Sequence, residues 1–112
     1  MQQLTDQINP AQRILLAAYD CLSTRGYANV TMRNIADEAG VALSQLTYYY
    51  KSKEKLFTEV ISKMANQYIH EIETRMSATA DLNEKIVSLT QYFTEMLRDK
   101  QKLLKLFIDF AA

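Results

Sequence analysis

The stretch from Thr31 to Leu56 constrains the fold more than any other part of this 112-residue chain. It reads as two short helices joined by a tight turn, followed by the start of a third helix. Gly40 lies at the turn, and glycine can end a helix at positive φ because it has no Cβ to clash with the backbone. Ala36, one turn earlier, is small enough to let two helices cross closely. The stretch therefore predicts a helix-turn-helix, a motif whose second helix enters the major groove of DNA.

The alternative is an ordinary corner between two helices of a structural domain. Tyrosines occupy positions 48–50 at the end of the second helix, and Lys51 and Lys53 follow them. A helix of about two turns cannot bury three consecutive rings, because neighbouring side chains diverge by about 100° around its axis. At least one tyrosine must face solvent beside the lysines, which suits contacts to DNA phosphates. The sequence therefore favours DNA binding over a purely structural corner.

The same stretch resembles the N-terminal DNA-binding region of TetR-family transcriptional regulators. The residues that carry the resemblance are Gly26, Tyr27, Thr31, Ile35, Ala36, Ala39, Gly40, Val41, Leu46, Tyr48, Tyr50, Lys51, Lys53 and Leu56. The chain departs from the usual family pattern at Ala42, Ser44, Gln45, Thr47 and Tyr49. These departures leave the predicted fold intact and bear on which operator sequence is read.

The resemblance implies a helix-turn-helix DNA-binding domain of three helices over residues 1–52. Over residues 53–112 it implies a long connecting helix and part of a helical effector domain. It further implies a ligand-responsive repressor that binds a pseudo-palindromic operator in double-stranded DNA as a homodimer, with an unknown small molecule as its effector. Regulators of this family usually continue well past this length. The chain is therefore predicted to be the N-terminal part of a longer regulator, or a truncated form, that self-associates through its last three helices.

The composition supports an all-α fold. The chain has two glycines and one proline, and 48% of its residues are hydrophobic, so helices are rarely interrupted and a core is available. A formal net charge of zero argues against a polybasic arm, although a local basic patch is sufficient for DNA binding. The single Cys21 cannot form an internal disulfide, which favours a reducing cytoplasm. No signal peptide or long apolar span suggests export or a membrane.

Capping residues predict where the helices begin and end. Residues 1–8 are polar and predicted to fray, and the first helix follows Asn9 and stops at Gly26. Thr31 caps the second helix, and the third spans roughly residues 42–50. Ser52 caps a long fourth helix that runs to about residue 76. Asp81 and Glu84 resemble a capping box for a fifth helix, and a polar break near residues 99–101 precedes a last apolar segment.

The third helix carries most of the predicted DNA contacts. With Leu46 buried, helical geometry places Ser44 and Tyr48 on the opposite face and Gln45 and Thr47 at its flanks. Gln45 can pair with adenine, and Thr47 can contact a thymine methyl or a phosphate. Tyr48 and Tyr49 can donate to phosphates. Leu43 falls toward the core side, with a thymine methyl as its alternative partner.

Residues outside the third helix complete the predicted site. Arg33 can read guanine, clamp a phosphate or pair with Asp37, and the resemblance favours a DNA contact. Lys53 at the start of the fourth helix is predicted to anchor a phosphate, with a merely exposed lysine as the alternative. The full predicted set of DNA-binding residues is Thr31, Arg33, Leu43, Ser44, Gln45, Thr47, Tyr48, Tyr49, Lys51 and Lys53.

Two other classes of function were weighed against a DNA-binding regulator. A helical protein-interaction module without DNA binding is the alternative, and salt-dependent DNA binding would separate the two. The sequence holds no paired carboxylates, metal-ligand cluster or nucleophile with a base, so no enzyme activity, cofactor or metal is predicted. Cys21 is interpreted as a small buried hydrophobe, and His70 as a surface or hydrogen-bonded histidine.

Overall fold

The computed structural model describes residues 9–112, so the fraying predicted for residues 1–8 lies outside it. Within residues 9–112 every regular element is a helix, which confirms the predicted all-α class. The elements are α2 (Pro10–Arg25), the 3-10 turn η1 (Tyr27–Asn29), α3 (Met32–Ala39), α4 (Leu43–Tyr49), α5 (Lys53–Ser77), α6 (Leu82–Asp99) and α7 (Gln101–Ala111).

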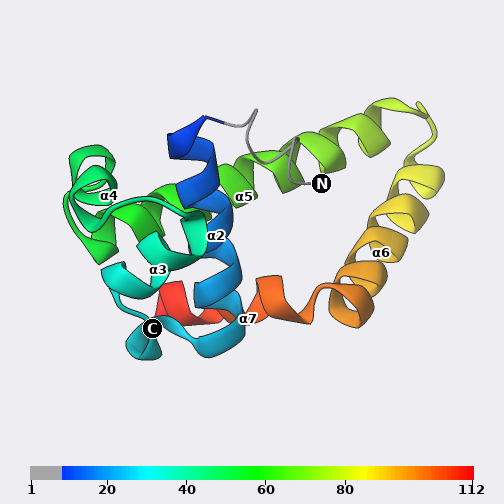
Figure 1. Cartoon of the computed structure of the whole chain (residues 1–112). Helices are drawn as coiled ribbons and strands as arrows, with labels where there is room; N and C mark the ends of the chain where they lie inside the picture. Colours follow the sequence, from blue (N-terminus) through cyan, green and yellow to red (C-terminus); the bar gives the residue numbers. More distant parts are fainter. Residues whose placement is uncertain (1–8) are drawn as a thin grey trace.

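The chain forms a helical body and an arm (Figure 1). In the body, α2 packs against α3, α7 and the first part of α5, and α4 packs against α3. The arm consists of the rest of α5 and the returning helix α6, and the molecule measures 52 × 33 × 23 Å. At 25 residues, α5 is about 38 Å long, so it reaches well beyond the body. After the arm, α7 runs back beneath α2 and closes the body.

Local capping bonds explain most of the helix boundaries, as predicted. The Asn9 side chain accepts the Gln12 N–H at 2.9 Å, and the Ser52 hydroxyl oxygen accepts the Lys55 N–H at 3.1 Å. Gly26 has φ 85° and ends α2. Each cap satisfies a backbone group that the helix itself leaves without a partner.

The start of α6 differs from the predicted capping box. Asp81 caps the helix by accepting the Asn83 N–H at 2.8 Å, but Glu84 does not return to the Asp81 backbone. Instead, Glu84 accepts a hydrogen bond from the Thr79 hydroxyl, and the oxygen of Thr79 accepts the Asp81 N–H at 3.1 Å. The predicted reciprocal box is therefore wrong, because Thr79 satisfies the backbone group that Glu84 was expected to reach.

Two hydrophobic clusters hold the helices together. The larger one fills the body, and its fully buried side chains include Ile14, Leu22, Ile35, Leu46, Leu56 and Leu106. The smaller one joins α5, α6 and α7 through Tyr68, Tyr92 and Leu103. The larger core continues from the helix-turn-helix into α5 and α7, so it crosses the predicted boundary at residue 52. The division into two domains stays a prediction.

Cys21 lies in the larger core and is 2% exposed, as predicted for a small buried hydrophobe. Its thiol donates to Oε2 of Glu38 at 3.1 Å and links α2 to α3. Burial, and then the Glu38 carboxylate, raise the pKa of the thiol to about 12. The thiol is therefore neutral near pH 7, and a neutral buried thiol is chemically inert.

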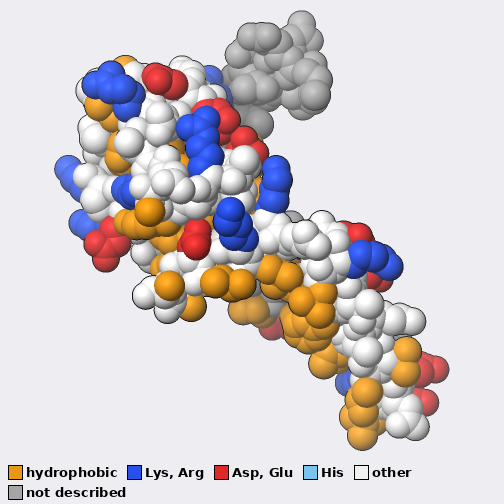
Figure 2. Space-filling view, turned by 90° about the horizontal axis from the view of Figure 1, so that it is seen from below, with side chains coloured by type: hydrophobic (Ala, Val, Ile, Leu, Met, Phe, Trp, Pro, Cys, Tyr) orange, Lys and Arg blue, Asp and Glu red, His pale blue; other side chains and the backbone are white. Residues whose placement is uncertain are grey.

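The arm is sparsely covered. Tyr92 is the only buried residue of α6. Leu82 and Leu97 are 69% and 64% exposed, and Ile69 on α5 is also exposed. Figure 2 shows hydrophobic side chains gathered along the arm and continuing onto the body. Among residues 9–112, no helix is long and apolar enough to cross a membrane.

We expect Gly40→Val to destabilise the protein by at least about 1–2 kcal/mol, because Gly40 has φ 70° and left-handed backbone is costly for residues with a Cβ. No atom lies within 4 Å of the position that a Cβ would take, so the loss comes from the backbone alone. Gly40→Asn is the matched control, since asparagine tolerates this conformation better. Thermal unfolding followed by circular dichroism measures both variants, and equal midpoints for all three proteins would contradict the assignment.

Candidate nucleic-acid interface

The corner between α3 and α4 is closed by backbone hydrogen bonds. Gly40 adopts the left-handed conformation, with φ 70° and ψ 34°. Its N–H donates to the Asp37 carbonyl at 3.2 Å, and the Val41 N–H donates to the Ala36 carbonyl at 3.0 Å. These bonds satisfy carbonyl groups at the end of α3. The predicted turn is confirmed, with Ile35 and Ala36 buried beneath it.

The outward face of α4 carries the residues that helical geometry placed there. Leu46 is fully buried, whereas Tyr48 is 78% exposed and Ser44 is exposed. Tyr50 packs against the larger core, and burial raises the pKa of its hydroxyl. Tyr49 is partly exposed and meets the Tyr48 ring edge-on, with centroids 5.4 Å apart. The outward surface of α4 therefore presents hydroxyl and amide groups.

Two predicted α4 contacts are restricted by their surroundings. The Thr47 hydroxyl donates to the carbonyls of Leu43 and Ser44, at 3.2 and 3.0 Å, so its proton is directed back to its own helix. Leu43 packs against the larger core, as predicted for the core side of the helix. Gln45 is half-buried and has no side-chain hydrogen bond among residues 9–112, so its amide is available to a partner.

The beginning of α3 is closed by a reciprocal capping box. The Thr31 hydroxyl oxygen accepts the Asn34 N–H at 3.1 Å, and the Asn34 side chain accepts the Thr31 N–H at 2.9 Å. The hydroxyl proton of Thr31 remains free to donate. Arg33 is exposed, and within residues 9–112 it forms no ion pair, so the alternative of a pair with Asp37 is not realised.

Lys53 differs most from its sequence-based interpretation. Its ammonium donates to the Tyr27 carbonyl at 2.7 Å and to the Val30 carbonyl at 2.9 Å, and it lies 4.1 Å from the centre of the Tyr27 ring. The alternative of a merely exposed lysine is therefore wrong. Lys53 ties this helix to the loop between α2 and α3, and a phosphate contact through its remaining N–H stays a prediction.

Other groups near the start of α5 are free to meet an anion. Lys51 and Lys55 are exposed, and neither forms an ion pair within the part of the chain described. The first N–H groups of a helix lack internal acceptors and lie at its positive end. Lys55 was not among the predicted residues. Its position in the first turn of α5 is the signal that could have identified it.

Most of the predicted residues belong to one structural unit. α3 and α4 pack against each other, so Thr31, Arg33 and the outward side chains of α4 share it (Figure 1). Lys51 lies in the bend that joins this unit to α5. Lys53 points back to the protein, and Leu43 contributes mainly to packing. No group of three or more potential metal ligands occurs within residues 9–112.

Comparison with known proteins gives a match for the same region. Residues 14–60 match the model of the tetR family of bacterial regulatory proteins. An uncharacterised HTH-type transcriptional regulator of Xanthobacter autotrophicus is 36% identical over 66 residues, which are 59% of this chain and 31% of that protein. The fatty acid metabolism regulator protein of Bacillus subtilis is 26% identical over 88 residues, which are 78% of this chain and 45% of that protein.

A solved structure extends the similarity beyond the motif. The crystal structure of SCO7518 from Streptomyces coelicolor, described as a transcriptional regulator, aligns with 89% of this chain at 29% identity and a TM-score of 0.81. The alignment covers 58% of that protein. The chain thus spans between about a third and somewhat more than half of the length of these three proteins.

Lys53→Met should lower the free energy of unfolding by about 1–3 kcal/mol, because two backbone carbonyls lose a charged donor while the apolar stem is kept. Lys55→Met, in the same helical turn but exposed, is the matched control and should change stability little. Urea unfolding measures both. If the two variants lose the same stability, the contacts of Lys53 do not contribute.

Proposed function

We propose that the chain is a member of the tetR family of bacterial regulatory proteins, whose model matches residues 14–60, and that it binds duplex DNA as a transcriptional regulator. One observation carries the proposal. The outward face of α4 presents Ser44, Gln45 and Tyr48, and the body beneath it uses none of their polar side-chain groups among residues 9–112. A helix that leaves such groups free on a convex edge of the molecule suits the major groove.

Base reading is assigned to Gln45 and Arg33. The Gln45 amide offers one donor and one acceptor, which match the N7 and N6 groups of adenine. The Arg33 guanidinium is unpaired within the described residues and can meet the two acceptors of guanine. Ser44 can bond either kind of base edge. Thr47 offers a methyl group rather than a free hydroxyl proton, which favours thymine over phosphate.

Backbone contacts are assigned to the groups around α4. The hydroxyls of Tyr48 and Tyr49 and the free proton of Thr31 can donate to phosphate oxygens. Lys51 adds a positive charge in the bend before α5. The free N–H groups in the first turn of α5 lie at the positive end of that helix and can also bind a phosphate. These contacts would set the position of α4 on the duplex without selecting a sequence.

Regulation is proposed to follow the scheme in which a repressor binds a pseudo-palindromic operator as a homodimer and responds to a small-molecule effector. The exposed apolar side chains of α6 and α7 support self-association, because contiguous apolar surface favours a partner. The packing of α7 against α2 supports communication between the arm and the DNA-binding helices. A purely protein-binding module would share the apolar surface but leave the polar face of α4 without a role.

Gln45→Ala and Arg33→Ala should each relax the sequence preference at one position of each operator half-site. A base-edge contact discriminates by about 1–3 kcal/mol, so the preferred base at that position should lose roughly ten- to a hundredfold of its advantage. Selection of binding sites from a random duplex library measures this. Gln67→Ala, an exposed position on α5, is the control. Unchanged preferences in both variants would show that neither residue reads bases.

Lys51→Gln should weaken binding to operator and random duplexes by the same factor. Loss of one phosphate ion pair should reduce the slope of log affinity against log salt by about one. Affinity over a salt series measures the slope for both duplexes, with Lys63→Gln on the exposed side of α5 as the control. Binding with no dependence on salt would contradict DNA binding itself and would favour the interaction module.

A further inference from the structure

The peptide group between Val30 and Thr31 is held at both of its polar ends. Its carbonyl, from Val30, accepts a hydrogen bond from the ammonium of Lys53 at 2.9 Å. Its N–H, from Thr31, donates to the side chain of Asn34 at 2.9 Å. The Val30 side chain is 1% exposed in the larger core, so the residue before the cap of α3 has little freedom to turn. The direction in which α3 leaves the loop is therefore set partly by the first residue of α5.

Tyr27, earlier in the same loop, is held in a similar way. Its carbonyl accepts a second hydrogen bond from Lys53 at 2.7 Å, and its N–H donates to the Asp109 carboxylate at 3.3 Å. The Lys53 ammonium lies 4.1 Å from the centre of the Tyr27 ring, and the ring stacks on Phe57 with centroids 4.8 Å apart. One ammonium thus holds two peptide groups and one ring of the loop between α2 and α3.

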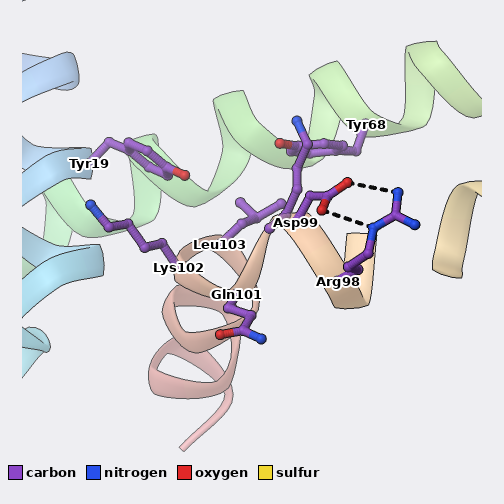
Figure 3. Close-up of a pocket in the computed structure, with 8 residues that line it drawn as sticks. Tyr19, Tyr68, Arg98, Asp99, Gln101, Lys102 and Leu103 are labelled. Carbon is purple, nitrogen blue, oxygen red and sulfur yellow. Dashed lines mark hydrogen bonds and ion pairs between the residues drawn. The ribbon is translucent and has the colours of Figure 1, made fainter. Parts of the chain in front are cut away.

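No other cationic side chain among residues 9–112 donates to backbone carbonyls. Arg75 pairs with Glu95 of the arm at 3.1 Å. Arg98 binds its neighbour Asp99 through two N–H groups, at 3.0 and 3.1 Å (Figure 3). These two arginines hold side chains on the arm, whereas Lys53 holds the backbone that leads into α3.

The neighbouring lysines are arranged differently. Lys51 and Lys55 are exposed, and their side chains form no ion pair within the described residues. Their ammonium groups are available to phosphates, whereas Lys53 has one N–H left, because an ammonium has three donors. The basic residues around the start of α5 therefore divide into two outward charges and one charge that is engaged within the protein.

An error in the position of α3 reaches the groups proposed to read bases. Arg33 lies in the first turn of α3, and α4 follows α3 through the closed corner at Gly40. A bidentate pair with a base needs two hydrogen bonds at once, and each weakens steeply outside a narrow range of distance and angle. Ionic contacts to phosphates tolerate such an error better, because Coulomb attraction falls slowly with distance.

We propose that Lys53 is a positioning residue for sequence preference, which fixes the start of α3 through the Tyr27 and Val30 carbonyls and contacts neither a base nor a phosphate. The inference rests on the proposed DNA binding and assigns one residue's part in it. Loss of a phosphate contact weakens every duplex by the same factor, whereas loss of positioning weakens mainly the preferred duplex. The two roles therefore predict different results for the same substitution.

The test compares Lys53→Met with Lys55→Met in the full chain. The probes are the duplex recovered by selection from a random library and a duplex of the same composition in scrambled order, each over a salt series. Lys53→Met should lower the ratio of the two affinities about tenfold or more, with an unchanged salt slope for the scrambled duplex. Lys55→Met removes the same charge from the same turn of α5 and should leave the ratio unchanged, even where it weakens both duplexes alike.

Residual dipolar couplings of the backbone amides measure the positioning step without DNA. In Lys53→Met, the couplings of α3 and α4 should no longer fit their orientation relative to α5 in the unaltered chain, and in Lys55→Met they should fit it. Asp109→Ala is a second variant, because it releases the Tyr27 N–H and removes no positive charge. It should lower the affinity ratio in the same direction, and it replaces Lys53→Met if that variant does not fold.

Equal losses for both duplexes, with a salt slope lowered by about one, would show a phosphate contact and overturn the inference. Unchanged couplings of α3 and α4 would overturn it too, as would an unchanged affinity ratio in Lys53→Met or in the variant that replaces it. If the unaltered chain shows no salt-dependent DNA binding, the proposed function fails and this inference fails with it. The two failures are distinguishable, because only the second is seen in the unaltered chain.

Discussion

The position of α3 and α4 depends on the contacts gathered around Tyr27. Lys53 at the start of α5 donates to the carbonyls of Tyr27 and Val30, and the Tyr27 ring stacks on Phe57 with centroids 4.8 Å apart. Phe110 meets the same Phe57 ring edge-on at 5.5 Å. The loop before α3 is thus held by α5 and by α7 at once. Because α4 is fixed to α3 by the corner at Gly40, these contacts set where its outward face lies.

The sequence predicted those features that depend on near neighbours. Asn9, Thr31 and Ser52 begin helices because their side chains accept N–H groups three residues ahead, and Gly40 ends one because of its own backbone. The outward position of Tyr48 follows from helical geometry once Leu46 is buried. Lys53 was misread because its carbonyl partners lie 23 and 26 residues away, where no local pattern indicates them. The packing of Tyr19 against the cluster of Tyr68, Tyr92 and Leu103 likewise joins residues far apart in the sequence.

The exposed side of α6 has a similar origin. At about 100° per residue, the apolar side chains of α6 other than Val87 span roughly 140° around the axis, which is wider than one neighbouring helix can cover. The side that carries Tyr92 and Met96 packs into the smaller cluster with α5. The other side carries the exposed residues Leu82, Ile86, Phe93 and Leu97. Periodicity thus identifies an apolar stripe correctly but does not say how many partners fill it. A stripe of this width leaves apolar surface open to a second partner, in line with the proposed association through the arm.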